Sequence, residues 1–150
     1  VLPWLGSPWQ DHPSARGLAF SAALAAQRSD WDELRQKFPE ADLCVLGDLN
    51  QDLSRRHYYG SALGRRALRA ALSSVALIPL TADPNDPVRS LDPIRASIDH
   101  ICVPATSTRM TNSLLQAWPP NAAMLRGLSD HFGRTATFAT PPQRKFFPAL

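Results

Sequence analysis

The segment ASIDHICVP, residues 96–104, decides the fold, because an apolar strand-like run meets an Asp-His pair there. A second Asp-His pair lies thirty-one positions further along, in GLSDHFGRTATF at residues 127–138, again beside a strand-like run. A third acidic element, LCVLGDLNQD, lies upstream at residues 43–52. What these segments can do together depends on whether they meet in space.

The pattern of apolar residues around these segments predicts an α+β fold. Residues 15–38 and 61–75 are expected to be helices, since apolar side chains recur there at helical spacing. The predicted apolar stripe of the first helix consists of Phe20, Leu24, Gln27, Trp31, Leu34 and Phe38. Strands are expected at residues 42–50, 75–81, 96–104, 110–118 and 134–140. This order favours one sheet with helices on one face, and the apolar residues on both sides of the strands predict a further cover over the second face.

The composition is that of an ordinary globular chain. Its 150 residues are 44% hydrophobic and 19% charged, which sets it apart from disordered chains. The formal net charge of +3 suits an anionic ligand. No apolar run approaches the roughly 20 residues that span a bilayer, so no transmembrane segment is expected.

The two cysteines, Cys44 and Cys102, lie inside apolar strand-like runs. We expect both to be buried and reduced, since a free cysteine behaves as a small hydrophobe. A disulfide between neighbouring strands is the alternative. The sequence contains no CxxC or HExxH spacing, which argues against a structural zinc site.

The tetrapeptide GDLN, residues 47–50, places an acid and an amide at the end of a predicted strand. Side chains two apart in a strand point to the same face, so Asp48 and Asn50 would project together, roughly 7 Å apart. Such a pair can hold a metal-bound water or a phosphate oxygen. The plainer alternative is a strand that ends in a turn, because Asp and Asn both favour turns. A calcium loop starting at Asp48 is disfavoured, since its sixth and twelfth positions are Leu53 and Tyr59 rather than Gly and Glu.

The two Asp-His pairs favour a contact between strands rather than within one. Neighbouring residues of a regular strand point to opposite faces, so Asp99 cannot serve His100, nor Asp130 His131. The useful contact would be crosswise, between Asp99 and His131, because a carboxylate fixes the tautomer of an imidazole and raises its basicity. This leaves Asp130 for a metal ion, while His100 is expected to be a satisfied, half-buried histidine.

The motifs VLGDLN, SIDHICV and LSDHFG, in this order, resemble the endonuclease/exonuclease/phosphatase superfamily, the DNase I-like metal-dependent phosphoesterases. Members of this superfamily fold as a four-layer α/β/β/α sandwich. The resemblance extends from Val1 to about Thr140 and implies that residues 1–140 are the C-terminal half of such a domain. That half would be a mixed, mainly antiparallel sheet with helices on one face, and residues 141–150 would form a loose tail.

Two departures from the superfamily pattern define the expected partner. The first half of a superfamily member carries a metal-binding Glu and an early Asn, and neither has a counterpart in this sequence. We therefore expect a fragment of a longer domain, with the N-terminal half of the same domain as its partner. The fragment alone is expected to show little turnover and an exposed apolar sheet face.

Carried over residue by residue, the resemblance implies a hydrolytic site. Asp48 would orient or deprotonate the attacking water and contribute to metal binding, and Asn50 would position that water and touch the phosphate. His131, held by Asp99, would stabilise the transition state or transfer a proton. Asp130 would help to bind Mg²⁺ or Mn²⁺. Carboxylate and amide oxygens suit such hard cations, which neutralise the charge of a phosphate ester during attack.

The segment after GDLN, QDLSRRHYYGSALGRR at residues 51–66, is rich in Arg and Tyr. Arg55, Arg56 and Tyr59 are candidates for binding the phosphates of the substrate and stacking on a base or sugar, as in nucleic-acid-binding proteins. The alternative is a solvated loop that leads into a helix. With the basic balance of the chain, this segment favours a nuclease among the phosphoesterases. A catalytically silent domain that keeps the fold and binds a partner is the rival hypothesis.

Overall fold

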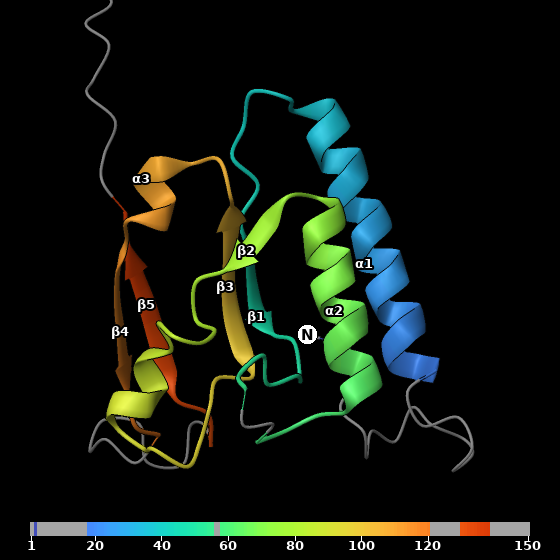
Figure 1. The fold of residues 1–150 in the computed structure, drawn as a ribbon. Helices are drawn as coiled ribbons and strands as arrows, with labels where there is room; N and C mark the ends of the chain where they lie inside the picture. The colour runs from blue at the N-terminus through green and yellow to red at the C-terminus, as the bar shows by residue number, and fades with distance from the viewer. Residues whose placement is uncertain (1, 3–17, 56–57, 121–129, 139–150) are drawn as a thin grey trace, which may run out of the picture.

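The computed structural model of the protein describes residues 2, 18–55, 58–120 and 130–138. Figure 1 shows two long helices beside two small antiparallel sheets, which confirms the predicted α+β fold class. In chain order the elements are α1 (Leu18–Lys37), β1 (Val45–Asp48), α2 (Ala62–Ser74), β2 (Leu77–Pro79), the 3₁₀ helix η2 (Pro87–Ser90), β3 (Asp99–Pro104), α3 (Thr108–Thr111), β4 (Leu114–Trp118) and β5 (Gly133–Thr137).

Each helix and strand expected from the sequence is present, but the strands are shorter than predicted. Of the expected strand at residues 110–118, only the second half is extended, because the chain first makes the short helix α3. α2 begins where Ser61 accepts a hydrogen bond from the backbone N–H of Gly64 at 2.9 Å. This cap satisfies one of the N–H groups that a helix leaves without a partner in its first turn.

The strands form two sheets, so the prediction of a single sheet is wrong. β3 is the centre of a three-stranded antiparallel sheet in the order β1-β3-β2, and β4 pairs only with β5. β1 and β2 occupy both edges of β3, so β4 and β5 satisfy their backbone groups with each other instead. The two sheets lie side by side in Figure 1 and share an apolar cluster, in which Leu115 and Ala136 pack against Leu80, Ile101 and Val103.

α1 and α2 lie side by side and cover one face of the three-stranded sheet (Figure 1). The main core lies beneath them and includes Phe20, Leu24 and Trp31 of α1 and Leu68 and Leu72 of α2. Each such buried side chain contributes roughly 1.5–3 kcal/mol relative to an exposed one. The first half of the predicted apolar stripe of α1 is therefore confirmed.

The last two members of that predicted stripe are not part of the core. Leu34 is 45% exposed and Phe38 is 53% exposed. In Figure 1 the C-terminal end of α1 extends beyond α2, so α2 does not cover the helix there. The helical spacing of the stripe was right, but spacing alone does not show where the neighbouring helix stops.

The strand register assigns the side chains of β1 and β3 to the two faces of their sheet. Leu46 faces Ile101, and Asp48 faces Asp99. Residues that face each other across an antiparallel pair project to the same side, and alternate residues share a face. Asp48 and Asp99 therefore lie on the face turned away from the helices, whereas Cys102 projects into the core beneath α1 and α2.

The face that carries the two aspartates is only partly covered. The second sheet buries Ile101 and Val103, but Leu46 remains 62% exposed and Ile78 37% exposed. Ile78 faces Val103 in the register of β2 and β3, so it belongs to the same face. This exposed apolar edge agrees with the expectation that the helices alone do not cover the sheet.

Two further expectations concern the thiols and the membrane. Cys44 and Cys102 are both free, so the disulfide alternative is not formed. Burial raises the pKa of both thiols, that of Cys102 to about 12. In the part of the chain that the structure describes, no helix has the length and apolar character needed to cross a bilayer.

Candidate metal centre

Three side chains from distant parts of the sequence meet at one end of β3. Asp48 ends β1, Asp99 begins β3, and His131 lies just before β5. Ligand atoms of the three side chains lie within 4.8 Å of one another, and all three residues are half-buried. One cation can therefore be reached by all of them. We call Asp48, Asp99 and His131 the candidate metal centre.

Asp99 and His131 form the crosswise pair that the strand alternation predicted. Nδ1 of His131 lies 3.0 Å from each carboxylate oxygen of Asp99. Burial works against the charged imidazolium, but the hydrogen bond from His131 to Asp99 and the charges of Asp99, Asp48 and Asp130 outweigh it and raise the pKa of His131. The contact also fixes the tautomer, because an imidazole that faces a carboxylate through Nδ1 carries a proton there.

Asp48 is held by Asn50, although not in the way that a regular strand would allow. β1 ends at Asp48, and Asn50 has a backbone φ of 50°, a left-handed conformation that Asn adopts more readily than most residues. The backbone N–H of Asn50 donates to Oδ1 of Asp48, and its Nδ2 donates to Oδ2, both at 2.8 Å. The chain thus makes the turn that was the plainer alternative for GDLN, and this turn orients the carboxylate.

The side-chain amide of Asn50 makes a second hydrogen bond. Its Nδ2 also donates to the backbone carbonyl of Leu2 at 2.6 Å, and Leu2 in turn donates its N–H to the carbonyl of Asp48 at 2.9 Å. Both N–H bonds of the amide are therefore used within the protein, which leaves neither for a phosphate. In this arrangement Asn50 holds Asp48 in place.

The surroundings of Asp48 disfavour its negative charge and raise its pKa. Burial raises the pKa of Asp48, the hydrogen bond from the backbone of Asn50 lowers it, and the charge of Asp99 raises it further, with a raised pKa as the net result. A cation between the two carboxylates would remove this repulsion.

Arg134 is a member of the site that the sequence did not reveal. It lies on β5, and its Nη1 donates to Oδ2 of Asp99 at 2.6 Å. An arginine in an alternating strand resembles any solvent-facing residue. One feature of the sequence could have indicated its role. Arg134 lies three residues after His131, at the start of the strand that follows this histidine.

Asp130 does not join the other acidic residues. Its side chain is 99% exposed, and its Oδ1 lies 3.8 Å from Nε2 of His131. It is not among the three residues whose ligand atoms cluster. Asp99 lies close to Asp48 instead, because the register of β1 and β3 brings the two residues opposite each other.

The structure describes two of the three predicted substrate-binding residues, Arg55 and Tyr59. Tyr59 is half-buried, and burial followed by the charge of Asp48 raises the pKa of its phenol, which places it near the candidate metal centre. Arg55 is exposed and its backbone N–H donates to Oδ2 of Asp83 at 2.9 Å. Arg56 lies outside the described residues.

His100 is a structural histidine, as expected, but it is fully rather than half buried. Only 1% of it is exposed. Nε2 lies 2.9 Å from the carbonyl of Gln51, and Nδ1 lies 3.1 Å from Oγ1 of Thr81. A carbonyl only accepts, so Nε2 carries the proton and Nδ1 accepts from the hydroxyl. Burial lowers the pKa of His100 and keeps the ring neutral.

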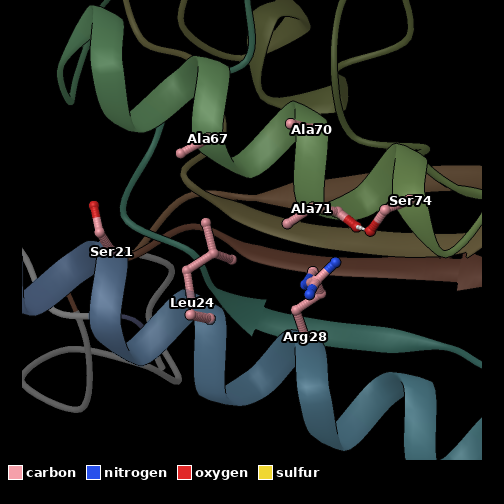
Figure 2. A pocket seen from close by; sticks show the side chains of 8 residues that line it. Ser21, Leu24, Arg28, Ala67, Ala70, Ala71 and Ser74 are labelled. Carbon is pink, nitrogen blue, oxygen red and sulfur yellow. Dashed lines mark hydrogen bonds between the residues drawn. The ribbon is translucent and has the colours of Figure 1, made fainter.

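A groove between the two long helices is a separate feature. It lies between α1 and α2, has a volume of about 390 Å³, and is lined by Leu24 and Arg28 together with small residues such as Ala67 and Ala71 (Figure 2). Ser74 in this groove donates its hydroxyl to the carbonyl of Ala71. None of the residues of the candidate metal centre lines it.

Comparison with family models, curated proteins and solved structures finds no match to this chain. The site is therefore assessed on its own donor set. Two carboxylates suit Mg²⁺ and Mn²⁺, and an imidazole nitrogen shifts the preference toward a transition metal. The residues of the candidate metal centre thus fit Mn²⁺ as a set, and its carboxylates alone fit Mg²⁺.

Proposed function

We propose that the chain is half of a divalent-metal-dependent phosphoesterase of the DNase I-like superfamily. The observation that supports this is the meeting of Asp48, Asp99 and His131, one from each of the three motifs that carry the resemblance, within 4.8 Å. A chance match of three short motifs would not be expected to bring one polar side chain from each to a common point. The contact of His131 with Asp99 adds support, since the alternation of the strands predicted it independently.

The chemistry that the site can perform is the hydrolysis of a phosphate ester. A bound Mg²⁺ or Mn²⁺ would act as a Lewis acid on a phosphate oxygen. Asp48, fixed by Asn50, is placed to orient a water molecule and accept its proton. His131, whose proton on Nδ1 is held by Asp99, is placed to stabilise negative charge or to transfer a proton.

Among phosphate esters, we propose a nucleic acid as the substrate class. The charge of Asp48 acts on the phenol of Tyr59, and an aromatic ring in this region could stack on a base or sugar. Arg55 is exposed on the segment that precedes it and can contact a neighbouring phosphate. The net charge of +3 agrees with an anionic polymer as ligand.

The partner that we propose is the N-terminal half of the same domain. The exposed side chains of Leu46 and Ile78 lie on the sheet face that also carries Asp48 and Asp99. If a sheet of the N-terminal half packed on these apolar side chains, its edge would lie beside the candidate metal centre. It would also supply the acidic and amide groups that the resemblance implies and this sequence lacks.

The test combines metal binding with turnover. Mn²⁺ binding to this chain is measured by calorimetry, and hydrolysis of bis-p-nitrophenyl phosphate and plasmid nicking are measured for a longer protein that includes the N-terminal half. We expect millimolar or tighter Mn²⁺ binding, and turnover that EDTA abolishes. Binding without turnover in the longer protein would favour the catalytically silent alternative. Absence of binding at millimolar Mn²⁺ would rule out the proposed metal centre.

A further inference from the structure

Arg134 connects the candidate metal centre to a buried polar network. Its side chain is only 7% exposed. Nη1 donates to Oδ2 of Asp99 at 2.6 Å and to the carbonyl of Phe132 at 2.8 Å, while Nε donates to Oγ of Ser97 at 2.9 Å. The guanidinium is therefore held at two of its nitrogens, and one of these contacts is to a carboxylate of the candidate metal centre.

Ser97, which accepts a hydrogen bond from Arg134, is itself held by hydrogen bonds to Asp86. The hydroxyl of Ser97 donates to Oδ1 of Asp86 at 2.6 Å, and its backbone N–H donates to Oδ2 at 2.7 Å. Asp86 also accepts from the backbone N–H of Val88 at 3.0 Å, as the N-cap of η2. Ser97 and Asp86 are both buried. Because the single hydroxyl proton of Ser97 is used on Asp86, its oxygen is left as an acceptor aimed at Arg134.

This arrangement fixes the orientation of Asp99. A carboxylate that accepts only from a half-exposed histidine can rotate about its χ2 bond, which is a broad torsion. Arg134 restricts that rotation because its Nη1 also donates to Oδ2 of Asp99 at 2.6 Å. Charge-assisted hydrogen bonds from arginine are the stronger and more directional ones.

The same contact changes what Asp99 can offer to a cation. Both carboxylate oxygens already face a donor, since His131 lies 3.0 Å from each and Arg134 lies 2.6 Å from Oδ2. A cation that approaches Asp99 meets the positive guanidinium at close range. Asp48, by contrast, has no arginine among its described hydrogen bonds, and the donors described for its carboxylate belong to the uncharged Asn50.

We propose that Arg134 is a positioning residue of the site. It orients Asp99 as the fixed partner of His131 and disfavours a cation at Asp99, so that Asp48 is the principal carboxylate for the cation. The part that concerns the cation rests on the proposed function. The part that concerns the Asp99–His131 pair does not, because it follows from the hydrogen bonds alone.

The test has two independent readouts on the full chain. The first is the exchange rate with solvent of the proton on Nδ1 of His131, followed by NMR with labelled imidazole nitrogens. The second is the dissociation constant for Mn²⁺, measured by calorimetry. In Arg134→Gln we expect the proton to exchange at least about tenfold faster, and Mn²⁺ to bind about fivefold more tightly because a repelling charge of modest, partly screened effect is gone.

Two further variants separate orientation from charge. Ser97→Ala keeps the positive charge of Arg134 but removes its anchor, so we expect faster exchange of the His131 proton with unchanged Mn²⁺ affinity. Arg134→Lys keeps the charge but not the fork of donors, and the same result is expected. Arg89→Gln is the matched control, since it removes another partly buried arginine that pairs with an aspartate, Asp83, at 3.1 Å. It should change neither readout.

The outcomes that would overturn the proposal are distinct from those that test the function. If Arg134→Gln leaves the exchange of the His131 proton unchanged, Arg134 does not position the pair. If Arg134→Gln is unfolded by circular dichroism, Ser97→Ala and Arg134→Lys decide in the same way. If Mn²⁺ binds Arg134→Gln no more tightly than the wild type, the proposed division between Asp48 and Asp99 is wrong. If the wild type binds no Mn²⁺, the proposed function fails, and the NMR readout still decides the role of Arg134.

Discussion

Asp48 and Asp99 stand directly opposite each other in the antiparallel pair of β1 and β3. Two like charges in facing positions destabilise a sheet. Asp99 accepts hydrogen bonds from Arg134 and His131, whereas the described hydrogen bonds to the carboxylate of Asp48 come from Asn50. Under the proposed function, a cation bound beside Asp48 and Asp99 would relieve this repulsion.

The first prediction concerns this facing pair. Asp48→Asn should weaken Mn²⁺ binding at least about tenfold, equivalent to about 1.4 kcal/mol, because the principal carboxylate is lost. In EDTA the same variant should be as stable as the wild type or more stable by roughly a few tenths of a kcal/mol, since a screened repulsion is removed. Calorimetry and urea unfolding measure the two effects.

Asp30→Asn is the control for that experiment. Asp30 is an exposed carboxylate of α1, the helix on the opposite side of the sheet, so its loss should affect neither quantity. A loss of stability in Asp48→Asn comparable to its loss of binding would mean that Asp48 supports the fold rather than a cation.

The second prediction concerns His131 in the longer protein that includes the N-terminal half. His131→Ala should lower kcat for phosphodiester hydrolysis by about 100-fold or more, because proton transfer or charge stabilisation by a positioned histidine contributes this much. Mn²⁺ affinity should change less than kcat, since Asp48 remains. Steady-state kinetics and calorimetry on the same preparation check both parts. Full activity in His131→Ala would show that His131 does not act in proton transfer or charge stabilisation.

Much of this site followed from the alternation of side chains in strands. The pairing of Asp99 with His131 required only that neighbours in a strand point to opposite faces, and the structure confirms it. His100 was expected to be a structural, half-buried histidine, and it is structural but fully buried. Alternation excluded a contact of each Asp with its neighbouring His, and the packing of the two sheets then brought His131 to Asp99.

Other features depend on packing that the sequence does not encode locally. Arg134 became a partner of Asp99 only through the packing of the two sheets, since β5 pairs with β4 and not with β3. Asp130 was predicted as a metal ligand because the crosswise pairing left it free and the resemblance implied this role, and its side chain is 99% exposed. Leu34 was assigned to the core by its spacing, but α2 ends before it. The surroundings of these side chains depend on residues that are distant in the sequence.

The third prediction is a pH dependence of stability that originates at His100. Burial lowers the pKa of His100 in the folded state, so the unfolded chain binds a proton more readily. The contribution to stability is therefore complete above the unfolded pKa of about 6.5 and is lost as the pH falls below it. The slope should approach about 1.4 kcal/mol per pH unit for one proton.

The measurement for His100 compares two proteins in EDTA. Urea unfolding of the wild type and of His100→Gln is followed between pH 8 and pH 5. The wild type should lose stability more steeply on acidification than the variant, which has no titrating group at this position. His131 shifts in the opposite direction in both proteins, so its effect cancels in the difference. Parallel pH profiles would show that His100 is not held neutral by the fold.

The fourth prediction concerns the exposed apolar edge formed by Leu46 and Ile78. The double variant Leu46→Lys, Ile78→Lys should keep the stability of the chain within about 0.5–1 kcal/mol, because both side chains are substantially exposed. It should bind less of an apolar dye and lose any gain in thermal stability that the N-terminal half gives to the wild type. Leu63→Lys on α2, where Leu63 is 63% exposed, is the control. An unchanged response to the N-terminal half would place its contact elsewhere.

The last prediction uses the two thiols to test the sheet itself. Cys102 is fully buried in the central strand, and burial raises its pKa to about 12, while Cys44 on the neighbouring chain segment is half-buried. The thiolate is the reactive form, so iodoacetamide at pH 8 should modify Cys44 in the native protein and leave Cys102 untouched until the chain unfolds. In Cys44→Ser, the rate of Cys102 modification should then report global unfolding and should rise with urea in parallel with the unfolded fraction. Mass spectrometry of digested samples assigns each site. If Cys102 reacts as fast as Cys44 in native buffer, β3 is not the protected centre of the sheet, and the facing positions of Asp48 and Asp99 that depend on it would be lost as well.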